Sequence, residues 1–166
     1  MSVIEQVRRE REDLARVLKN HKGIRKLVED LYPDRAHFIY ELLQNAEDAG
    51  ATEVQFTLSK SELSFEHNGR PFDARDIYGI TDIGEGTKAE DEDKIGRFGV
   101  GFKAVFAYSE TPHIWSPDFS FKITELVLPS ELNSKPELGK RTRFEFPFNN
   151  LKKTSEDAYA EVRKGL

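Results

Sequence analysis

Residues 95–103 read Ile-Gly-Arg-Phe-Gly-Val-Gly-Phe-Lys, so three glycines spaced G-x-x-G-x-G run directly into an apolar segment. Glycine lets the backbone approach an anion closely, and a helix that starts there adds free N–H groups and the positive end of its dipole. The stretch therefore predicts a phosphate-binding turn followed by a helix over residues 100–108. A glycine-rich turn is often only a turn, so this interpretation depends on a second segment.

That second segment, residues 41–50, reads Glu-Leu-Leu-Gln-Asn-Ala-Glu-Asp-Ala-Gly. On a helix, Glu41, Asn45 and Asp48 fall within about 60° of one another beside an apolar face. The Asn45 carbonyl oxygen suits Mg²⁺, a hard cation often shared with substrate phosphates, and Glu41 could accept a proton from an attacking water. Taken alone, the segment fits an ordinary amphipathic helix with its acids in water equally well. Together with the glycine motif it indicates a nucleotide site.

The composition limits the class of protein. With 166 residues, 37% of them hydrophobic and 33% charged, the chain is typical of one globular domain with enough core to fold. It has no cysteine, and its four histidines lack zinc-ligand spacing, which argues against disulfides and structural zinc. A formal charge of -5 argues against a general nucleic-acid surface. The first residues lack a long apolar run, so we expect no signal peptide, no membrane span, and a cytoplasmic or otherwise intracellular location.

Apolar periodicity and breaker residues divide the chain into blocks of helices and strands. Because these blocks do not alternate strictly, we expect an α+β two-layer sandwich with a mixed, mostly antiparallel sheet covered on one face by helices. We predict three parts: an N-terminal helical segment (1–33), a core (34–150) with a mobile lid at about 81–94, and a C-terminal helix leading to a following domain (151–166). Helices are predicted over residues 2–20, 23–31, 35–49, 74–78 and 100–108 and after residue 154, and strands over residues 53–58, 62–67, 113–115, 119–124, 126–128 and 143–148.

In their order along the chain, the two motifs resemble the ATP-binding domain of the GHKL superfamily. That group covers gyrase-type topoisomerases, the large heat-shock chaperones, sensor histidine kinases and mismatch-repair ATPases. Residues 50–52, Gly-Ala-Thr, and residues 67–72, His-Asn-Gly-Arg-Pro-Phe, are most similar to the chaperone-like ATPase regions of the sacsin group. The resemblance runs from residue 35 to residue 146 and implies a fold of the GHKL type.

The resemblance also implies a role for each matching residue. Glu41 corresponds to the general base of the hydrolytic members, Asn45 to the residue that holds Mg²⁺ against the triphosphate, and Asp48 to an acid that supports the pocket. The phosphate loop comprises Gly96, Gly99 and Gly101, the backbone N–H groups of Phe98, Val100 and Gly101 face the phosphates, and Phe102 belongs to the same nucleotide-binding stretch.

Three further positions follow from the same resemblance. Residues 84–94 match the ATP lid, in which Lys88 is expected to contact a phosphate. Lys103 is expected either to add positive charge near the phosphates or to lie in solvent. Thr142, on the last strand, corresponds to a threonine that reaches the base-binding carboxylate and water, with a purely structural strand threonine as the alternative.

The base-binding end departs from the family pattern. The family normally has an aspartate that accepts a hydrogen bond from the adenine amino group, and this chain has His67 there, with Gly69 in the same nucleotide-binding turn. A neutral imidazole can accept one such bond, would lose it on protonation near its usual pKa of ~6.5, and is expected to hydrogen-bond to Thr142. The alternative is a histidine that only packs at the strand end. Base selectivity is therefore open.

These observations predict a Mg²⁺-dependent ATP-binding domain with slow hydrolysis of ATP to ADP and phosphate. Nucleotide binding would drive conformational change or dimerisation in a larger chaperone-like protein, with further domains or a second copy as partners and neither membrane nor nucleic acid indicated. The alternative is an interaction module that kept the fold without turnover. Glu41 argues against a sensor-kinase domain, and the missing strand, crossover helix and later acid argue against dinucleotide binding.

Overall fold

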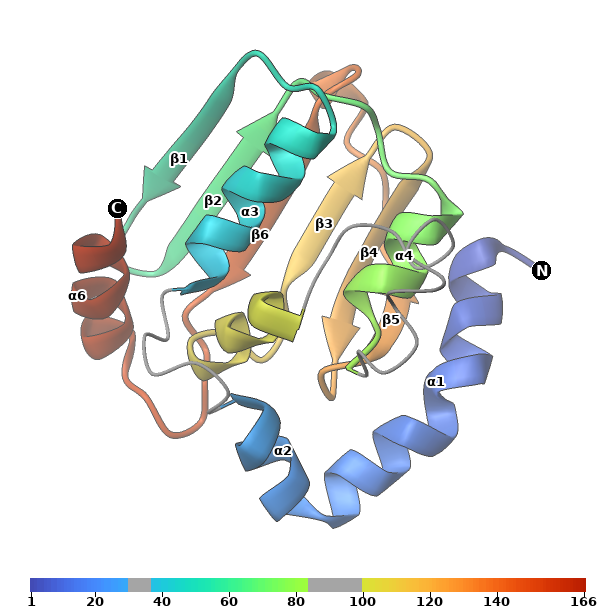
Figure 1. The fold of residues 1–166 in the computed structure, drawn as a ribbon, viewed down its shortest axis with the longest axis vertical. Helices are drawn as coiled ribbons and strands as arrows, with labels where there is room; N and C mark the ends of the chain where they lie inside the picture. The colour runs from blue at the N-terminus through green and yellow to red at the C-terminus, as the bar shows by residue number, and fades with distance from the viewer. Residues whose placement is uncertain (30–36, 84–99) are drawn as a thin grey trace.

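The computed structural model describes residues 1–29, 37–83 and 100–166, which form one six-stranded sheet in the order β1-β2-β6-β3-β4-β5 (Figure 1). Every pairing between the described strands is antiparallel, where the sequence predicted a mixed, mostly antiparallel sheet. The strands are β1 (Val54–Leu58), β2 (Glu62–His67), β3 (His113–Ser116), β4 (Phe119–Thr124), β5 (Leu128–Glu131) and β6 (Thr142–Pro147).

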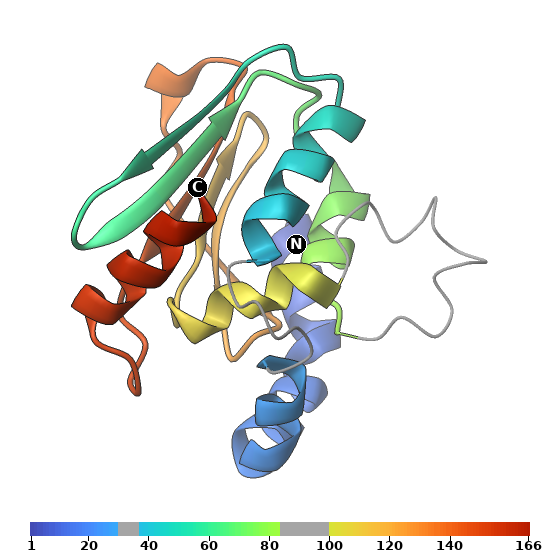
Figure 2. The same cartoon turned by 60° about the vertical axis from the view of Figure 1, so that its left-hand side comes forward.

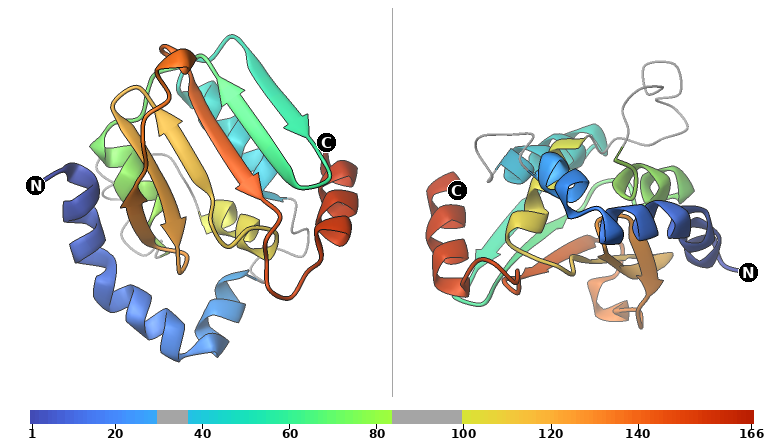
Figure 3. Two further views of the ribbon diagram at one scale, coloured as in Figure 1. Left: turned by 180° about the vertical axis from the view of Figure 1, so that it is seen from behind. Right: turned by 90° about the horizontal axis from the view of Figure 1, so that it is seen from below.

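Helices form a second layer on one face of this sheet (Figure 2), which confirms the predicted α+β two-layer sandwich. α3, α4 and the 3₁₀ helix η1 lie over the strands, and α1 packs beside β5. Among the described residues, no helix crosses the opposite face (Figure 3). The helices are α1 (Val3–Asn20), α2 (Lys22–Glu29), α3 (His37–Asp48), α4 (Ala74–Ile80), η1 (Val100–Ala107), η2 (Pro136–Leu138) and α6 (Ser155–Gly165).

The core lies between the helices and the inner face of the sheet. Phe65 of β2 stands opposite Phe144 of β6, and both rings are buried because alternate strand residues share a face. From the helical layer, the ring of Phe38 lies 5.6 Å from that of Phe146 in an edge-on arrangement. Burying a side chain of this size contributes roughly 1.5–3 kcal/mol. These contacts hold α3 against the sheet.

Local signals mark several of the element ends. Asp73 caps α4 through hydrogen bonds from the backbone of Arg75 and Asp76, and Asp76 returns a bond to the Asp73 backbone. Gly50, which follows α3, has φ +75°, the left-handed conformation that ends many helices. α4 continues two residues beyond the predicted end because Ile80 is buried in the core.

One strand is displaced from its prediction. The sequence predicted a strand at residues 126–128, but Glu125 and Leu126 have φ values of 50° and 68° and form a turn. A left-handed residue cannot continue an extended strand, so β5 begins only at Leu128. Leu126 is nevertheless fully buried, and this accounts for its apolar character.

Over the described ranges, no helix is long and apolar enough to cross a membrane.

Candidate functional site

α3 carries the first predicted motif on the boundary between core and cleft. Its apolar side chains, Leu42 and Ala46 among them, are buried against the sheet. Asn45 is only 9% exposed on the same face, and Glu41, one turn earlier, is half-buried. Asp48 is exposed and accepts a hydrogen bond from Gln44 Nε2 at 3.3 Å. The helix therefore turns Asn45 inward and Asp48 outward.

The amide of Asn45 is half satisfied. Its Nδ2 donates to the backbone carbonyl of Glu41 at 2.8 Å, and since a carbonyl can only accept, the other amide atom must be Oδ1. This Oδ1 is buried and has no hydrogen-bond partner among the residues that the structure describes. Leaving a buried acceptor unsatisfied costs about 1–3 kcal/mol, so such an atom needs an explanation. A hard cation would supply one, because amide oxygens are ligands that Mg²⁺ accepts.

The end of the glycine motif lies directly against α3. A Cβ added to Gly101 would stand 2.8 Å from His37 Cδ2 and 3.0 Å from both Cγ and Oε1 of Glu41. Such distances leave no room for a side chain, so the start of η1 meets Glu41 through bare backbone. The structure thus brings the two sequence motifs together, although they are some fifty residues apart.

The two residues after Gly101, Phe102 and Lys103, are buried in the core. Phe102 is fully buried and its ring lies 6.1 Å from that of Phe146. Lys103 is also buried, and its Nζ donates to the carbonyls of Ile80 at 2.5 Å and Leu126 at 2.6 Å. Both expectations for Lys103, charge at the phosphates or solvent exposure, are therefore wrong. The lysine instead ties η1 to the end of α4 and to the turn before β5.

A second glycine meets the other end of α3. A Cβ on Gly69 would lie 2.8 Å from the carbonyl oxygen of Ala49 and 3.0 Å from the nitrogen of Ala51, and Arg70 donates its backbone N–H to Ala49 at 2.7 Å. The turn after β2 therefore closes on the end of α3. Glu41 and Ala49 are eight residues apart, or about 12 Å along a helix. Asn45 lies between these two glycine contacts.

Replacing Gly69 by alanine is expected to lower the free energy of unfolding by about 1–3 kcal/mol, because the atoms that the new Cβ meets are backbone and cannot turn aside. Urea denaturation would measure it. Gly23→Ala is the matched control, since a Cβ there has open space within 4 Å and alanine favours the α2 helix, so its stability should stay equal or rise. Equal stability of Gly69→Ala and the wild type would contradict the close packing of this turn.

His67 is buried and hydrogen-bonded in a way that the sequence did not predict. It is only 5% exposed, and its Nδ1 accepts the backbone N–H of Gly69 at 3.0 Å. A neutral imidazole has one donor and one acceptor nitrogen, so Nε2 carries the proton and can only donate. Burial, and then the charge of Arg70, lower the pKa of His67 to about 4. The expectation of protonation near pH 6.5 is wrong.

This low pKa predicts a pH-dependent stability. In the unfolded chain His67 binds a proton below its ordinary pKa of ~6.5, while the folded protein resists protonation down to about pH 4. The free energy of unfolding should therefore be highest above pH 6.5 and fall toward pH 4, by at most roughly 3 kcal/mol. Urea denaturation across this range measures the slope. His67→Asn keeps an acceptor for the Gly69 N–H and should flatten the slope of stability against pH. The control His21→Asn, at an exposed position, should leave the slope unchanged. Equal slopes in the wild type and both variants would contradict the role of His67.

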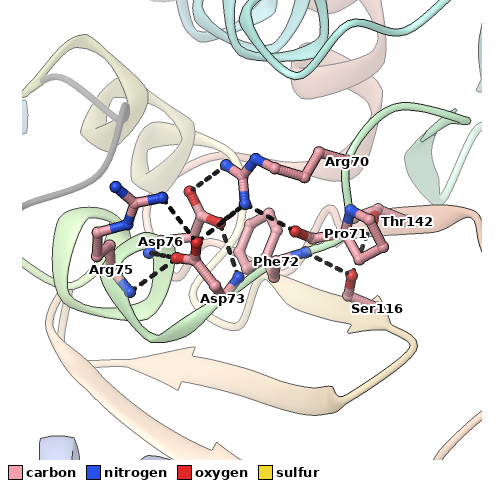
Figure 4. Close-up of polar contacts among 8 residues, drawn as sticks. All are labelled: Arg70, Pro71, Phe72, Asp73, Arg75, Asp76, Ser116 and Thr142. Carbon is pink, nitrogen blue, oxygen red and sulfur yellow. Dashed lines mark hydrogen bonds and ion pairs between the residues drawn. The ribbon is translucent and has the colours of Figure 1, made fainter. Parts of the chain in front are cut away.

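Thr142 takes a partner other than the predicted one. It stands directly opposite His67 in the sheet, but its hydroxyl lies 2.9 Å from Ser116 Oγ, which accepts the backbone N–H of Phe72 at 2.9 Å (Figure 4). The expected hydrogen bond between His67 and Thr142 is thus replaced by a chain from β6 through β3 to the turn after β2. The sequence does not indicate that Ser116 belongs to this hydrogen-bonded chain, because strand register decides that Thr142 is its neighbour.

A charged cluster beside this turn was also missed (Figure 4). Arg70 donates to the carbonyl of Pro71 at 2.9 Å, to Asp73 at 3.1 Å and to Asp76 at 3.3 Å. Asp76 is 4% exposed, so its charge needs this partner. The cluster joins the turn that carries His67 and Gly69 to the start of α4.

Part of the predicted site is outside the described residues. Of the predicted lid, only residues 81–83 are described, and Thr81 is buried with its hydroxyl bonded to the carbonyl of Ile77 at 2.8 Å. Val100 is described only as the first residue of η1. The positions outside are Lys88, Gly96, Phe98 and Gly99.

The fold and this arrangement define an α+β domain in which one helix meets Gly101 near its start and Gly69 near its end, with an unsatisfied amide oxygen between them. The sacsin domain family matches residues 18–164, and the chain belongs to that family. It is 36% identical to sacsin of Homo sapiens over 104 residues, 52% of this chain and 2% of that protein. It is 32% identical to Protein NO VEIN of Arabidopsis thaliana over 139 residues, 73% of this chain and 5% of that protein. The chain therefore spans only a small part of these relatives.

A solved structure shares the fold. The N-terminal domain of a DNA repair protein matches 85% of this chain and 45% of its own, with a TM-score of 0.58 and 16% sequence identity. At that identity the likeness concerns the fold alone.

Proposed function

We propose that this domain binds ATP together with Mg²⁺ and hydrolyses it slowly, as the resemblance to GHKL ATPases implies. The observation that carries the proposal is the buried, unsatisfied Oδ1 of Asn45, one helical turn from the Glu41 side chain that meets Gly101. Among the described residues, no three His, Cys, Asp or Glu side chains are grouped to hold a metal. This suits Mg²⁺, which in nucleotide sites takes few protein ligands and is completed by phosphates and water.

Each residue then has one task. Asn45 offers Oδ1 to the metal, while its own bond to the Glu41 carbonyl holds the amide in place. Glu41 takes the proton from the attacking water, and its side chain lies directly against the bare backbone of Gly101. The metal, when bound, neutralises charge that develops on the phosphates. These residues contribute mainly positioning and charge stabilisation.

The base-binding end of the proposed nucleotide site is expected to discriminate weakly between adenine and guanine. His67 presents a donor at Nε2 and its Nδ1 is already occupied by Gly69, so the imidazole cannot accept the amino group of adenine. It could donate instead to the ring N1 of adenine or to the keto oxygen of guanine. A site that offers no specific acceptor for the amino group loses the main means of rejecting other purines.

Calorimetric titration of the protein with ATP, ADP and GTP, with and without Mg²⁺, tests this function. We expect saturable ATP binding that requires Mg²⁺ and GTP affinity within about tenfold of that for ATP. No binding of any nucleotide under either condition would overturn the proposal and leave an interaction module without nucleotide. A strong preference for ATP would keep the function but contradict the role of His67.

Nucleotide binding would then act on a larger assembly. Because the chain spans a small part of its relatives, we propose that binding changes the arrangement of further domains or of a second copy. The affinity difference between two such arrangements sets how far ATP can shift them.

A further inference from the structure

Cationic side chains surround a cavity of about 480 Å³ at the end of η1. Its lining comes from the end of α1, α2, the end of η1 and the loop before α6. These segments lie in the lower part of the molecule in Figure 1. Two carboxylates, Glu110 and Glu125, share the lining. The basic residues of this cavity are Lys19, Lys22, Arg25, Lys26, Lys152 and Lys153.

Ion pairs neutralise only part of this charge. Arg25 donates to both oxygens of Glu110, at 2.7 and 2.9 Å, and Lys153 pairs with Glu161. Lys19, Lys22 and Lys152 have no acidic partner among the residues that the structure describes. The chain as a whole carries a formal charge of -5, so the cavity is a local exception to its acidic character.

The wall of the cavity is held in place by Asn150. Its Nδ2 donates to the carbonyl of Phe106 at 2.8 Å and to Glu110 at 3.1 Å, and its Oδ1 accepts the backbone N–H of Lys152 at 2.7 Å. The loop that carries Lys152 is thereby fixed to the end of η1. A fixed wall lowers the entropy cost of binding.

Like charges held close together repel, and a multivalent anion relieves that repulsion. Lysine ammonium groups act as compact point charges toward phosphate oxygens. A cavity of 480 Å³ is within the range of small-molecule sites, about 300–1,000 Å³. We propose that this cavity binds a small, multiply charged oxyanion, of which a short polyphosphate is the simplest form.

This site is separate from the proposed nucleotide site. η1 begins at Val100, one residue before the Gly101 that meets Glu41, and ends at Ala107, in the cavity wall. Its eight residues span about 14 Å at the rise of a 3₁₀ helix. The two sites therefore lie at opposite ends of one helix, and each can be removed by substitution without touching the other.

Calorimetric titration with inorganic tripolyphosphate, without Mg²⁺, tests the proposal. The triple variant Lys19→Gln, Lys22→Gln, Lys152→Gln should weaken binding by at least about tenfold, because it removes the three unpaired charges. The control triple variant Lys60→Gln, Lys140→Gln, Lys164→Gln changes the net charge equally at exposed sites elsewhere and should leave binding within about twofold. Thermal unfolding checks that both variants fold, and all six lysines are exposed, so they should.

The outcomes separate this proposal from the nucleotide proposal. Tripolyphosphate binding lost in Asn45→Ala but kept in the lysine variant would place the anion at α3 and overturn the inference. So would an absence of binding, equal losses in both triple variants, or binding of an acidic peptide such as oligoglutamate in place of tripolyphosphate. If the wild type binds no ATP but binds tripolyphosphate through the three lysines, the cavity assignment stands although the nucleotide proposal fails.

Discussion

Replacing Asn45 by alanine is expected to weaken Mg²⁺-dependent ATP binding about 100-fold, or roughly 3 kcal/mol, the scale of a contact to a charged group. The variant removes a buried acceptor that has no hydrogen-bond partner among the described residues. It also removes the Nδ2 bond to the Glu41 carbonyl. Loss of the unsatisfied Oδ1 stabilises the folded state and loss of the bonded Nδ2 destabilises it, so the two effects oppose each other. The free energy of unfolding should therefore change much less than the affinity.

Titration calorimetry and urea denaturation of the same preparations separate these two effects. Gln44→Ala is the matched control, because it removes an amide from the adjacent position of α3 whose partner is the exposed Asp48. It should bind ATP like the wild type. Wild-type affinity in Asn45→Ala would exclude this residue as a metal ligand, whereas equal losses in both variants would indicate a general effect on the helix.

Glu41→Gln is expected to lower the rate of ATP hydrolysis by about 10²–10⁴-fold, the usual contribution of a positioned general base. Glutamine has nearly the same volume, so the contact with Gly101 is kept and ATP binding should be unchanged. A loss of rate without a loss of affinity is the mark of a group that acts in the transition state.

Release of phosphate in a single turnover, with protein in excess of ATP, measures that rate even when it is slow. Glu47→Gln on the exposed side of α3 is the control and should hydrolyse ATP at the wild-type rate. A rate in Glu41→Gln equal to that of the wild type would remove Glu41 from the role of base. The proposal of ATP binding would then remain, without its catalytic part.

Much of the fold was predictable because its signals are local. The capping box at Asp73, the left-handed Gly50 and the alternating pattern of the β1–β2 hairpin each depend on residues within a few positions. The turn at Glu125 and Leu126 was missed, since neither residue type ordinarily takes a positive φ and the tertiary packing of Leu126 imposes it.

The candidate site, like the fold, could be predicted from the sequence only in part. The helical spacing of Glu41 and Asn45 could be predicted from the sequence. The unsatisfied state of Asn45 Oδ1 could not, because it depends on where all the neighbouring hydrogen-bond donors lie in the folded chain. Lys103 was misjudged for a related reason. Nothing in a run of small and apolar residues shows that two carbonyls from distant segments will meet its ammonium group.

Residue types and their spacing were enough to name the residues that could form a site: the glycines, the acid and amide on one helix face, and the histidine at the end of β2. Which hydrogen bonds each of them makes became apparent only in the folded chain. The backbone N–H of Gly69 binds Nδ1 of His67, so the imidazole has only its Nε2 donor left, and the hydroxyl of Thr142 hydrogen-bonds to Ser116. The physical reason is that a residue type fixes the capacity to donate and accept, while burial and strand register select the partner.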